Sequence, residues 1–476
     1  MEKTTMKYLS MAALALVGAA VTGCSSDDNI IADGQPAKQD NIVTVTTTVG
    51  LDDGDGGTTR ALAVDYTNKK VTKTFAVGDQ VALVYENTNA GNVKAVSQAL
   101  TAGDISADGK SATLTFSLTN PKADQTVFYY YPAALVNESG SLSIPMATQN
   151  GTLAGVESLD YAYNTGNMSG TTLSSVTLEN KFAIVALTLK DATGTNDITS
   201  NITGMTIKAG AENYAVTRTA AAGPIYVIMR PVTAEQTIAI TATDGTNNYI
   251  KTLTGKTYAA NNFYQQGLRM IPGANLSVVT ANYTAKNGET LTGTLDVENH
   301  PVQISIADGA TVTLDGVNVS GKNSSSYRWA GITCLGDATI ILTGANTVKG
   351  FHENYPGIHV PSGKTLTIQG SGSLTASSNG HGAGIGGGYS IACGNIAIEG
   401  GTITATGGAY AAGIGGGNGS ACGNITITSS VTKVTATKGE NATHSIGAGG
   451  NGGTVGTVTI GNTTGAITES PYTYQP

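Results

Sequence analysis

The sequence is poor in charged and in aromatic residues. Charged side chains make up 12% of the 476 residues, aromatic side chains make up 6%, and the formal net charge is -8. Lysine and arginine do not gather in a block, so the chain lacks the electrostatic footprint of a nucleic-acid-binding protein. We therefore expect no nucleic acid among its partners.

Long apolar runs are scarce as well, and the clearest one is Met11–Ala20. This run is too short to cross a bilayer, which needs about 20 apolar residues, and it has the size of a signal peptide core. The motif Val21–Cys24 follows and resembles the bacterial lipobox. The resemblance implies that residues 1–23 are removed and that Cys24 carries a lipid such as palmitate. The alternative is an ordinary signal peptide with an incidental cysteine.

The segment behind Cys24 is small, polar and acidic. Its acidic pair, Asp27 and Asp28, resembles the surface-export signal of some Gram-negative lipoproteins. This resemblance implies a protein anchored by its lipid in the outer membrane and displayed on the cell surface. Such a composition is typical of a flexible tether, which we place at residues 24–40.

Glycine, in contrast, is abundant, with 63 residues and no collagen-like period. Between the glycines, apolar and polar residues alternate, as at Val43–Val49 and Leu114–Leu118, which is typical of short strands joined by tight turns. Continuous apolar runs such as Phe182–Leu187 suit strands buried on both faces. The sequence therefore predicts an all-β fold, with two tandem β-sandwiches at 41–165 and 166–272.

Four motifs in this region resemble the fimbrillins, the subunits of type V pili. They are Thr58–Ala61, Phe75–Val81, Tyr130–Pro132 and Leu178–Ile184. The resemblance implies two transthyretin-like sandwiches and assembly with other pilus subunits by strand exchange. It also implies that an arginine-specific protease cuts between Arg60 and Ala61 and so releases an amino-terminal strand.

The residues around Arg60 are compatible with that implication. Asp52–Arg60 is acidic and glycine-rich, and exposed polar loops are where proteases cut. Loss of Asn41–Leu51 would leave an open sheet edge, which recruits another strand. The alternative is that Arg60 is an ordinary loop residue and that the strand stays in place.

The last part of the chain is repetitive. Ala383–Gly388 recurs as Ala412–Gly417, and looser copies precede it. Two further short strands follow each copy, a pattern that indicates a solenoid whose coils share one core. We predict a parallel β-helix at residues 273–462, followed by a tail at 463–476, with a β-propeller as the lesser alternative.

Two cysteines occupy equivalent places in successive repeats, Cys393 and Cys422. Adjacent coils should bring their Cα atoms about 4.8 Å apart, which permits a disulfide. A ladder of reduced thiols is the equal alternative.

Loops between the repeats carry rings and amides that should stack into a ridge on the solenoid. Flat rings beside amide and carboxylate groups suit a sugar, although the aromatic side chains could instead cover the apolar core. The candidate ligand-binding residues are Tyr327, Arg328, Trp329, Phe351, His352, Glu353, Asn354, Tyr355, His381 and Tyr410.

The stretch Ser305–Val317 resembles the parallel β-helix carbohydrate-binding domains of bacterial surface proteins. Such domains often bind calcium through stacked acidic residues, but Asp308, Asp315 and Asp337 are too scattered along the sequence to form an obvious oxygen cage. We therefore expect neither a metal nor a cofactor.

These features favour a surface adhesin over an enzyme, because the solenoid lacks clustered carboxylates for catalysis. The leading hypothesis is a pilus tip subunit whose β-helix binds carbohydrate or a host surface glycoprotein. One alternative is a lipid-anchored glycan-binding protein outside any pilus. A β-helix polysaccharide lyase or hydrolase and a passive stalk are the others.

Overall fold

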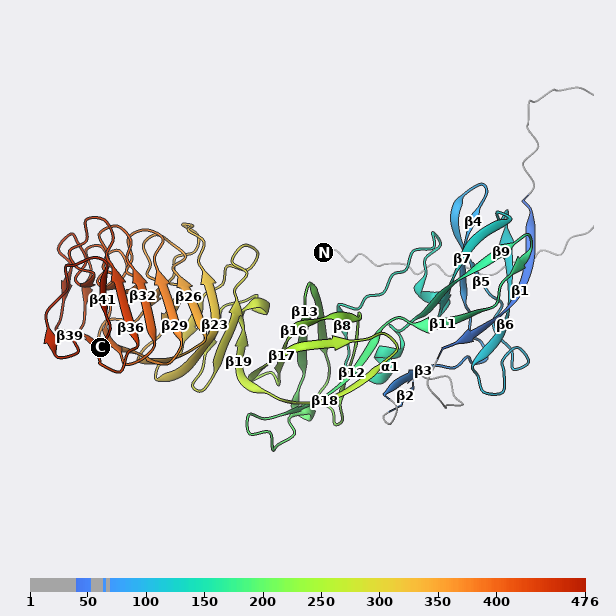
Figure 1. Ribbon diagram of the computed structural model, residues 1–476, viewed down its shortest axis with the longest axis horizontal. Coiled ribbons are helices and arrows are strands. Elements are labelled where there is room, and N and C mark those ends of the chain that lie inside the picture. Colours follow the sequence, from blue (N-terminus) through green and yellow to red (C-terminus); the bar gives the residue numbers. More distant parts are fainter. Residues whose placement is uncertain (1–39, 53–62, 66–68) are drawn as a thin grey trace, which may run out of the picture.

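The computed structural model describes residues 40–52, 63–65 and 69–476. Cys24 with the leader, and the candidate cleavage site at Arg60 and Ala61, lie outside these residues. Nearly all regular structure is β, which confirms the all-β prediction. Figure 1 shows the parts in a row, with the strands of the first sheet at one end and the carboxyl-terminal strands at the other. Within the described ranges, no helix is both long and apolar enough to span a membrane.

The first part is a single strongly bent sheet in the order β5-β4-β7-β9-β11-β1-β6, with β10 added to β9. Its inward-facing side chains alternate along each strand and form one apolar core that includes Val45, Leu114 and Tyr129. Its strands are β1 (Ile42–Leu51), β4 (Ala82–Asn87), β5 (Gly91–Val96), β6 (Ser111–Thr119), β7 (Asp124–Tyr131), β9 (Ala162–Ser169), β10 (Thr172–Leu173) and β11 (Val176–Asn180).

Strand β1 lies between two other strands of this sheet. It pairs antiparallel with β6 from Ile42 to Gly50, and its end, from Val49 to Leu51, pairs parallel with β11. Its side chains alternate between exposed and buried, and Val45, Val49 and Leu51 enter the core. The sheet is therefore complete only while a strand occupies this position.

The second part contains two facing sheets, β15-β12-β18 and a sheet built on β13, β14, β16 and β17, with β8 beside β14. The small hairpin of β2 (Ala63–Asp65) and β3 (Lys70–Thr72) packs here through Val71. The strands of the two sheets are β8 (Thr148–Gln149), β12 (Ala183–Lys190), β13 (Gly204–Ala209), β14 (Glu212–Thr217), β15 (Ile225–Met229), β16 (Val232–Thr243), β17 (Asn248–Tyr258) and β18 (Phe263–Arg269).

The boundary between these two parts differs from the expected one at residues 165 and 166. That position falls inside β9, which pairs with β7 along its whole length. The following strands, β10 and β11, also belong to the first sheet, and β12 is the first long strand of the second part. The structure therefore moves the boundary to the residues between Asn180 and Ala183. Only four helical turns occur in the described chain, namely α1 (Leu153–Glu157), η1 (Ala133–Leu135), η2 (Thr199–Asn201) and η3 (Leu276–Val278).

The third part is a stack of coils in which equivalent strands of successive coils pair in parallel and form ladders. One ladder runs β20-β22-β24-β27-β30-β33-β37. In it Ile358, Ile385, Ile414 and Ile446 face one another in register, all fully buried. Its strands are β20 (Tyr283–Ala285), β22 (Ile304–Ile306), β24 (Ile332–Cys334), β27 (Ile358–His359), β30 (Ile385–Gly386), β33 (Ile414–Gly415) and β37 (Ile446–Gly447).

Two further ladders complete the coils and share the long strand β23. The apolar side chains of all three ladders enclose one continuous core. The strands of these two ladders are β21 (Thr290–Thr294), β23 (Ala310–Ser320), β25 (Ala338–Thr343), β26 (Ala345–Lys349), β28 (Thr365–Gly370), β29 (Ser373–Ser377), β31 (Asn395–Ile398), β32 (Thr402–Thr406), β35 (Ile425–Ile427), β36 (Lys433–Thr437) and β39 (Val458–Ile460). A short pair, β34 (Ala421–Cys422) and β38 (Thr454–Val455), lies on the last coils.

Both ends of this solenoid are joined to other structure. At the start, β19 (Ile271–Asn275) pairs antiparallel with β17 and parallel with β21, so one sheet runs from the second part into the coils. At the far end, β40 (Thr463–Thr464) and β41 (Tyr472–Tyr474) pair antiparallel with β39 and β36. The segment expected to be a tail, 463–476, therefore closes the last coil.

The stacked isoleucines provide a test of the coil register. Ile414 is 0% exposed, whereas Thr404 of the preceding coil points to solvent. We expect Ile414→Asp to lower the free energy of unfolding by roughly 4 kcal/mol or more, because a charge is buried without a partner. Thr404→Asp should change it by about 0.5 kcal/mol at most. Chemical denaturation followed by circular dichroism measures both, and equal effects would contradict the register.

Candidate functional site

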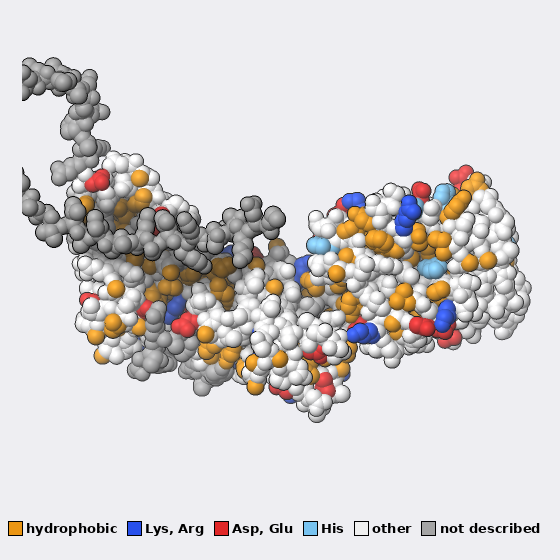
Figure 2. Space-filling view, turned by 180° about the vertical axis from the view of Figure 1, so that it is seen from behind, with side chains coloured by type: hydrophobic (Ala, Val, Ile, Leu, Met, Phe, Trp, Pro, Cys, Tyr) orange, Lys and Arg blue, Asp and Glu red, His pale blue; other side chains and the backbone are white. Residues whose placement is uncertain are grey.

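Five loops between the ladders stack into a ridge, which we call the loop ridge (residues 321–329, 350–356, 378–382, 407–411 and 438–444). Backbone hydrogen bonds join each loop to the next, for example from Phe351 N to Trp329 O at 3.2 Å and from Tyr410 N to Glu440 O at 2.7 Å. The Asn379 side chain donates to Gly321 O and Gly350 O and so fastens three loops. Figure 2 shows hydrophobic and histidine side chains gathered on the solenoid half of the molecule.

Three rings at the first two loops pack on one another. The ring centroids of Tyr327 and Trp329 are 5.5 Å apart, and those of Trp329 and Phe351 are also 5.5 Å apart. Phe351 is 0% exposed and belongs to the solenoid core, so it cannot touch a ligand. The prediction that Phe351 binds ligand is therefore wrong. Its ring turns inward because burying it removes a large apolar area from water, and Tyr327 and Trp329 cover it.

The next loops present polar rings that remain partly accessible. His352 and Tyr355 form one edge-to-face pair, with centroids 6.2 Å apart, and both are half-buried. His381 and Tyr389 form a second pair at 5.8 Å. Tyr389 is 46% exposed and was not among the predicted residues.

Tyr389 joins the ridge because its backbone N–H donates to Asn354 O at 2.8 Å. In the sequence it follows Gly386–Gly388, which indicates only a tight turn. One repeat later the equivalent position is Asn418, so the repeat carries no aromatic pattern that would have marked Tyr389.

The remaining predicted residues also lie on the loop ridge. Arg328 and Glu353 are exposed, and Arg328 Nε donates to Ser325 O at 3.1 Å. Asn354 is half-buried, and its backbone N–H donates to His352 Nδ1. Tyr410 is half-buried as well and has a left-handed backbone, with φ at 62°. The loop ridge carries three basic side chains (Lys322, Arg328 and Lys438) and two acidic ones (Glu353 and Glu440). With its rings, amides and hydroxyls, this is a nearly neutral surface that suits hydroxyl-bearing ligands.

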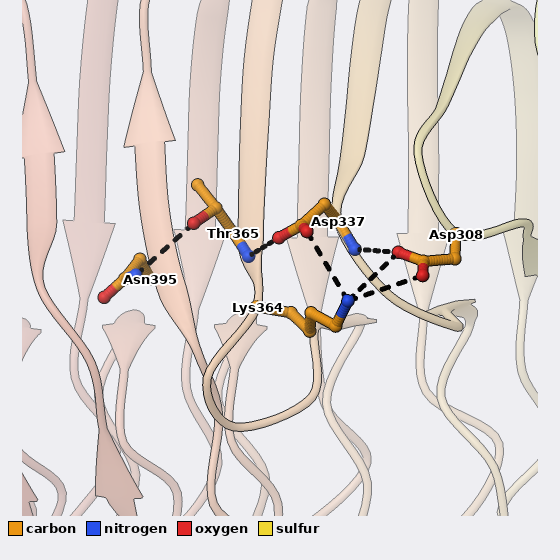
Figure 3. A network of polar contacts seen from close by, with 5 residues as sticks. All are labelled: Asp308, Asp337, Lys364, Thr365 and Asn395. Atoms are coloured by element: carbon orange, nitrogen blue, oxygen red, sulfur yellow. Dashed lines mark hydrogen bonds and ion pairs between the residues drawn. The ribbon is translucent and has the colours of Figure 1, made fainter.

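A second line of side chains follows another corner of the solenoid (Figure 3). The carboxylate of Asp308 accepts the backbone N–H of Asp337 at 2.8 Å, and the carboxylate of Asp337 accepts the N–H of Thr365, also at 2.8 Å. In later coils the side-chain oxygen of Asn395 accepts the backbone N–H of Asn424, and that of Asn424 accepts the N–H of Thr457. Each side chain thus satisfies a backbone donor one coil further along.

The arrangement of the acidic residues differs from the expectation that they are scattered. Asp308 and Asp337 lie in successive coils, and Lys364 Nζ lies between them, 3.3 Å from Asp308 Oδ1 and 3.5 Å from Asp337 Oδ2. The ammonium group occupies the place that a cation would take. In the part of the chain that the structure describes, no group of three or more histidine, cysteine or acidic residues is placed to hold a metal.

The stacked cysteines are free thiols. Cys393 and Cys422 are buried in neighbouring coils, with Cys393 N donating to Ala421 O at 2.9 Å. Their sulfur atoms approach different carbonyl groups, those of Gly415 and Gly394. A hydrogen bond with Cys422, together with burial, raises the pKa of Cys393, which keeps it protonated. The structure therefore lacks the disulfide that the repeat spacing permits.

The acid-and-lysine corner predicts a dependence on pH. Asp308 accepts the Asp337 N–H and faces Lys364, and both contacts hold its pKa below the ordinary value of 3.8. A lowered folded-state pKa gives stability that is present above 3.8 and is lost as the pH falls through the folded-state value. Asp308→Asn keeps the acceptor but loses the charge, so its melting temperature should be slightly below that of the wild type at neutral pH. The two should converge in acid.

Thermal unfolding across this pH range tests the assignment. Asp315→Asn is the control, because Asp315 lies in the strand that follows Asp308, β23, and forms no ion pair among the described residues. A deficit of Asp308→Asn that stayed constant down to the lowest pH would contradict the charge effect.

Comparisons with known proteins give only distant likenesses. No family model matches the chain, and no curated protein matches it. Among solved structures, a candidate cell adhesion protein from Bacteroides fragilis is 13% identical, with 48% of this chain and 92% of that chain covered and a TM-score of 0.28. The tip fimbrial protein Mfa3 from Porphyromonas gingivalis is 11% identical, with 49% and 96% covered and a TM-score of 0.26. A fimbrial assembly protein from Parabacteroides distasonis is 11% identical, with 48% and 91% covered and a TM-score of 0.26. At these values the likeness does not establish a family for this chain.

Proposed function

We propose that this protein is a surface adhesin that ends a pilus, with the solenoid as its binding head. The observation that carries the proposal is the placement of the two ends of the folded chain. Strand β1 fills a position between β6 and β11, whereas the carboxyl-terminal strands are built into the cap of the solenoid. A chain of this kind can accept a strand from a neighbour but has none to give.

The ability to accept a neighbour's strand follows from the backbone hydrogen bonds that β1 makes within the first sheet. Release of Ile42–Leu51 would bare the paired edge of β6 and the end of β11, together with the core positions of Val45, Val49 and Leu51. An open edge above an apolar groove binds an incoming strand through main-chain hydrogen bonds and side-chain pockets. Cleavage at Arg60, which the resemblance to fimbrillins implies, would permit that release.

The carboxyl-terminal strands β40 and β41 cannot be donated to a neighbour, because they cap the last coil of the solenoid. Tyr472 and Tyr474 pack on the solenoid core, and Ile467 pairs with Ile446 of the last coil. Withdrawing residues 463–476 to serve a neighbour would expose the open edges of β36 and β39. Such a subunit can only stand at the end of a fibre.

The lipid anchor and the surface location belong to the same proposal. Cys24 would hold the precursor in the outer membrane, and cleavage at Arg60 would separate the folded chain from that anchor. Without cleavage, β1 stays in place, and the protein remains a lipid-anchored adhesin on the cell surface. Both forms present the same solenoid head.

For the head we propose binding of carbohydrate, either free or on a host glycoprotein, without catalysis. The half-buried rings of His352, Tyr355 and His381, and the exposed ring of Tyr389, offer faces and edges to a sugar ring. Asn354 and Glu353 stand beside them as hydrogen-bonding groups. The carboxylates of Asp308 and Asp337 hold backbone N–H groups and Lys364, so they are not poised as an acid and base pair.

Immunogold labelling of sheared fibres tests the position in the pilus. Antibodies against the solenoid should mark fibre ends, because the chain accepts but does not donate a strand. An Arg60→Ala variant, which resists arginine-specific proteolysis, should leave the label on cell bodies. Gold along the whole shaft would exclude a terminal position.

A glycan array tests the head. Wild-type protein should bind a subset of glycans, and His352→Ala with Tyr355→Ala should weaken this binding about tenfold or more, since exposed rings in binding sites contribute strongly. Leu335→Ala is the matched control, because Leu335 is 53% exposed at another corner of the solenoid. Equal loss in the control, or no loss in the double variant, would argue against the loop ridge.

A further inference from the structure

A cavity of about 430 Å³ lies where the second part meets the start of the solenoid. One side of the cavity, its floor, is a face of the sheet that contains β13, β14 and β16. The other side is the segment 273–283, which leads from that sheet into the coils. The volume falls within the range of about 300–1,000 Å³ that is typical of small-molecule sites. None of the lining residues belongs to the loop ridge.

Small, mostly polar residues in register on three neighbouring strands make up the floor. They are Gly204 and Thr206 of β13, Ala215 and Thr217 of β14, and Thr241 and Thr243 of β16. Side chains alternate along a strand, so Met205, Val216 and Ala242 point to the opposite face and belong to the core of the second part. Because Gly204 has no side chain, the floor is hollowed between its two cross-strand partners.

Most of the hydroxyl groups on the floor are not used within the protein. Thr243 is the exception, since its Oγ1 donates to Asn247 O at 2.9 Å. Among the described residues, the hydroxyl groups of Thr206, Thr217 and Thr241 have no hydrogen-bond partner. Thr206 and Thr241 are half-buried at the floor of the cavity. Their partners must therefore come from molecules that enter it.

A buried carboxamide supplies a further free donor to the same cavity. Asn275 lines the cavity and is 7% exposed. Its side-chain oxygen accepts from Ser277 N at 3.0 Å and from Ser277 Oγ at 2.8 Å, which fixes the orientation of the amide. Among the described residues, its NH2 group has no partner. Buried amides normally use both ends, so this NH2 group is available to a ligand.

The lining also decides the kind of ligand, because it contains no charged side chain. A charged ligand would lose its hydration without meeting an opposite charge. A purely apolar ligand would leave the free hydroxyl groups and the NH2 group unsatisfied. Val278 and Val279, both half-buried in the lining, provide an apolar surface beside these polar groups.

We infer that this cavity is a second binding site, separate from the loop ridge, for a small neutral saccharide such as a disaccharide. The Asn275 NH2 group donates to a sugar hydroxyl, and the hydroxyl groups of Thr206 and Thr241 donate to or accept from others. The C–H groups of the sugar pack on Val278 and Val279. The inference goes beyond the proposed function, since neither strand acceptance nor the loop ridge is needed for it.

Calorimetric titration of the full chain with neutral disaccharides tests the inference. The parent protein carries His352→Ala and Tyr355→Ala, so that the loop ridge does not contribute. Lactose, cellobiose and N,N′-diacetylchitobiose are the probes, and at least one should bind. Sialyllactose, which carries a negative charge, should bind more weakly than lactose.

The floor is then changed without altering its shape. Thr206→Val together with Thr241→Val removes two hydroxyl groups and should weaken binding about tenfold or more. Thr217→Val, at an exposed position, should weaken it less and leaves the fold undisturbed. The matched control is Thr237→Val, because Thr237 is exposed on the same face of β16 but outside the cavity, and its affinity should equal that of the parent.

The outcomes separate this inference from the proposed function. If the wild type binds a probe and the parent with the altered loop ridge binds none, the ridge is the saccharide site and the inference is overturned. Undiminished binding in both the double valine variant and Thr217→Val would also overturn it, as would tighter binding of sialyllactose than of lactose. Loss of binding only in the valine variants of the floor, at unchanged melting temperature, supports the cavity.

Discussion

The structure depends on the pairing of strand edges. A strand has two rows of backbone donors and acceptors, and each row must be satisfied or covered. In the solenoid, each coil pairs the backbone donors and acceptors of the coil before it. The first and the last coil each lack one neighbouring coil, so their outer edges need another partner. Strand β19 supplies the start by joining the sheet of the second part, and β40 with β41 supplies the end. In the first sheet the same need is met by β1, whose loss would leave an unsatisfied edge.

Much of the architecture could be predicted from the sequence because the relevant signals are local or periodic. The repeated Ala-Gly-Ile-Gly-Gly-Gly segments contain Ile385 and Ile414, and the structure stacks these residues in register. The alternation at Val43–Val49 marks a half-buried strand, and β1 occupies that stretch. The stacking of the loops also followed from the repeat, since equivalent positions in successive coils become neighbours.

The features that the sequence did not reveal are contacts between residues far apart in the chain. Lys364 lies between Asp308 and Asp337 only because coils bring together positions that are about one repeat apart, and no local pattern links an acid to a distant lysine. The inward turn of Phe351 depends on how the folded coils pack around it in the core, which a sequence does not show. The break between the first two parts was misplaced because β9 alternates like any strand and its partner, β7, lies more than 30 residues earlier.

The shared sheet between the second part and the solenoid has a mechanical consequence. Strand β19 is bonded to β17 on one side and to β21 on the other, so the head has no free hinge at Ile271. Bending there would have to shear main-chain hydrogen bonds rather than rotate a loop. The orientation of the loop ridge relative to the second part is therefore set by paired strands. In the adhesin proposed above, a load on the solenoid would pass into the second part through main-chain hydrogen bonds rather than through a loop.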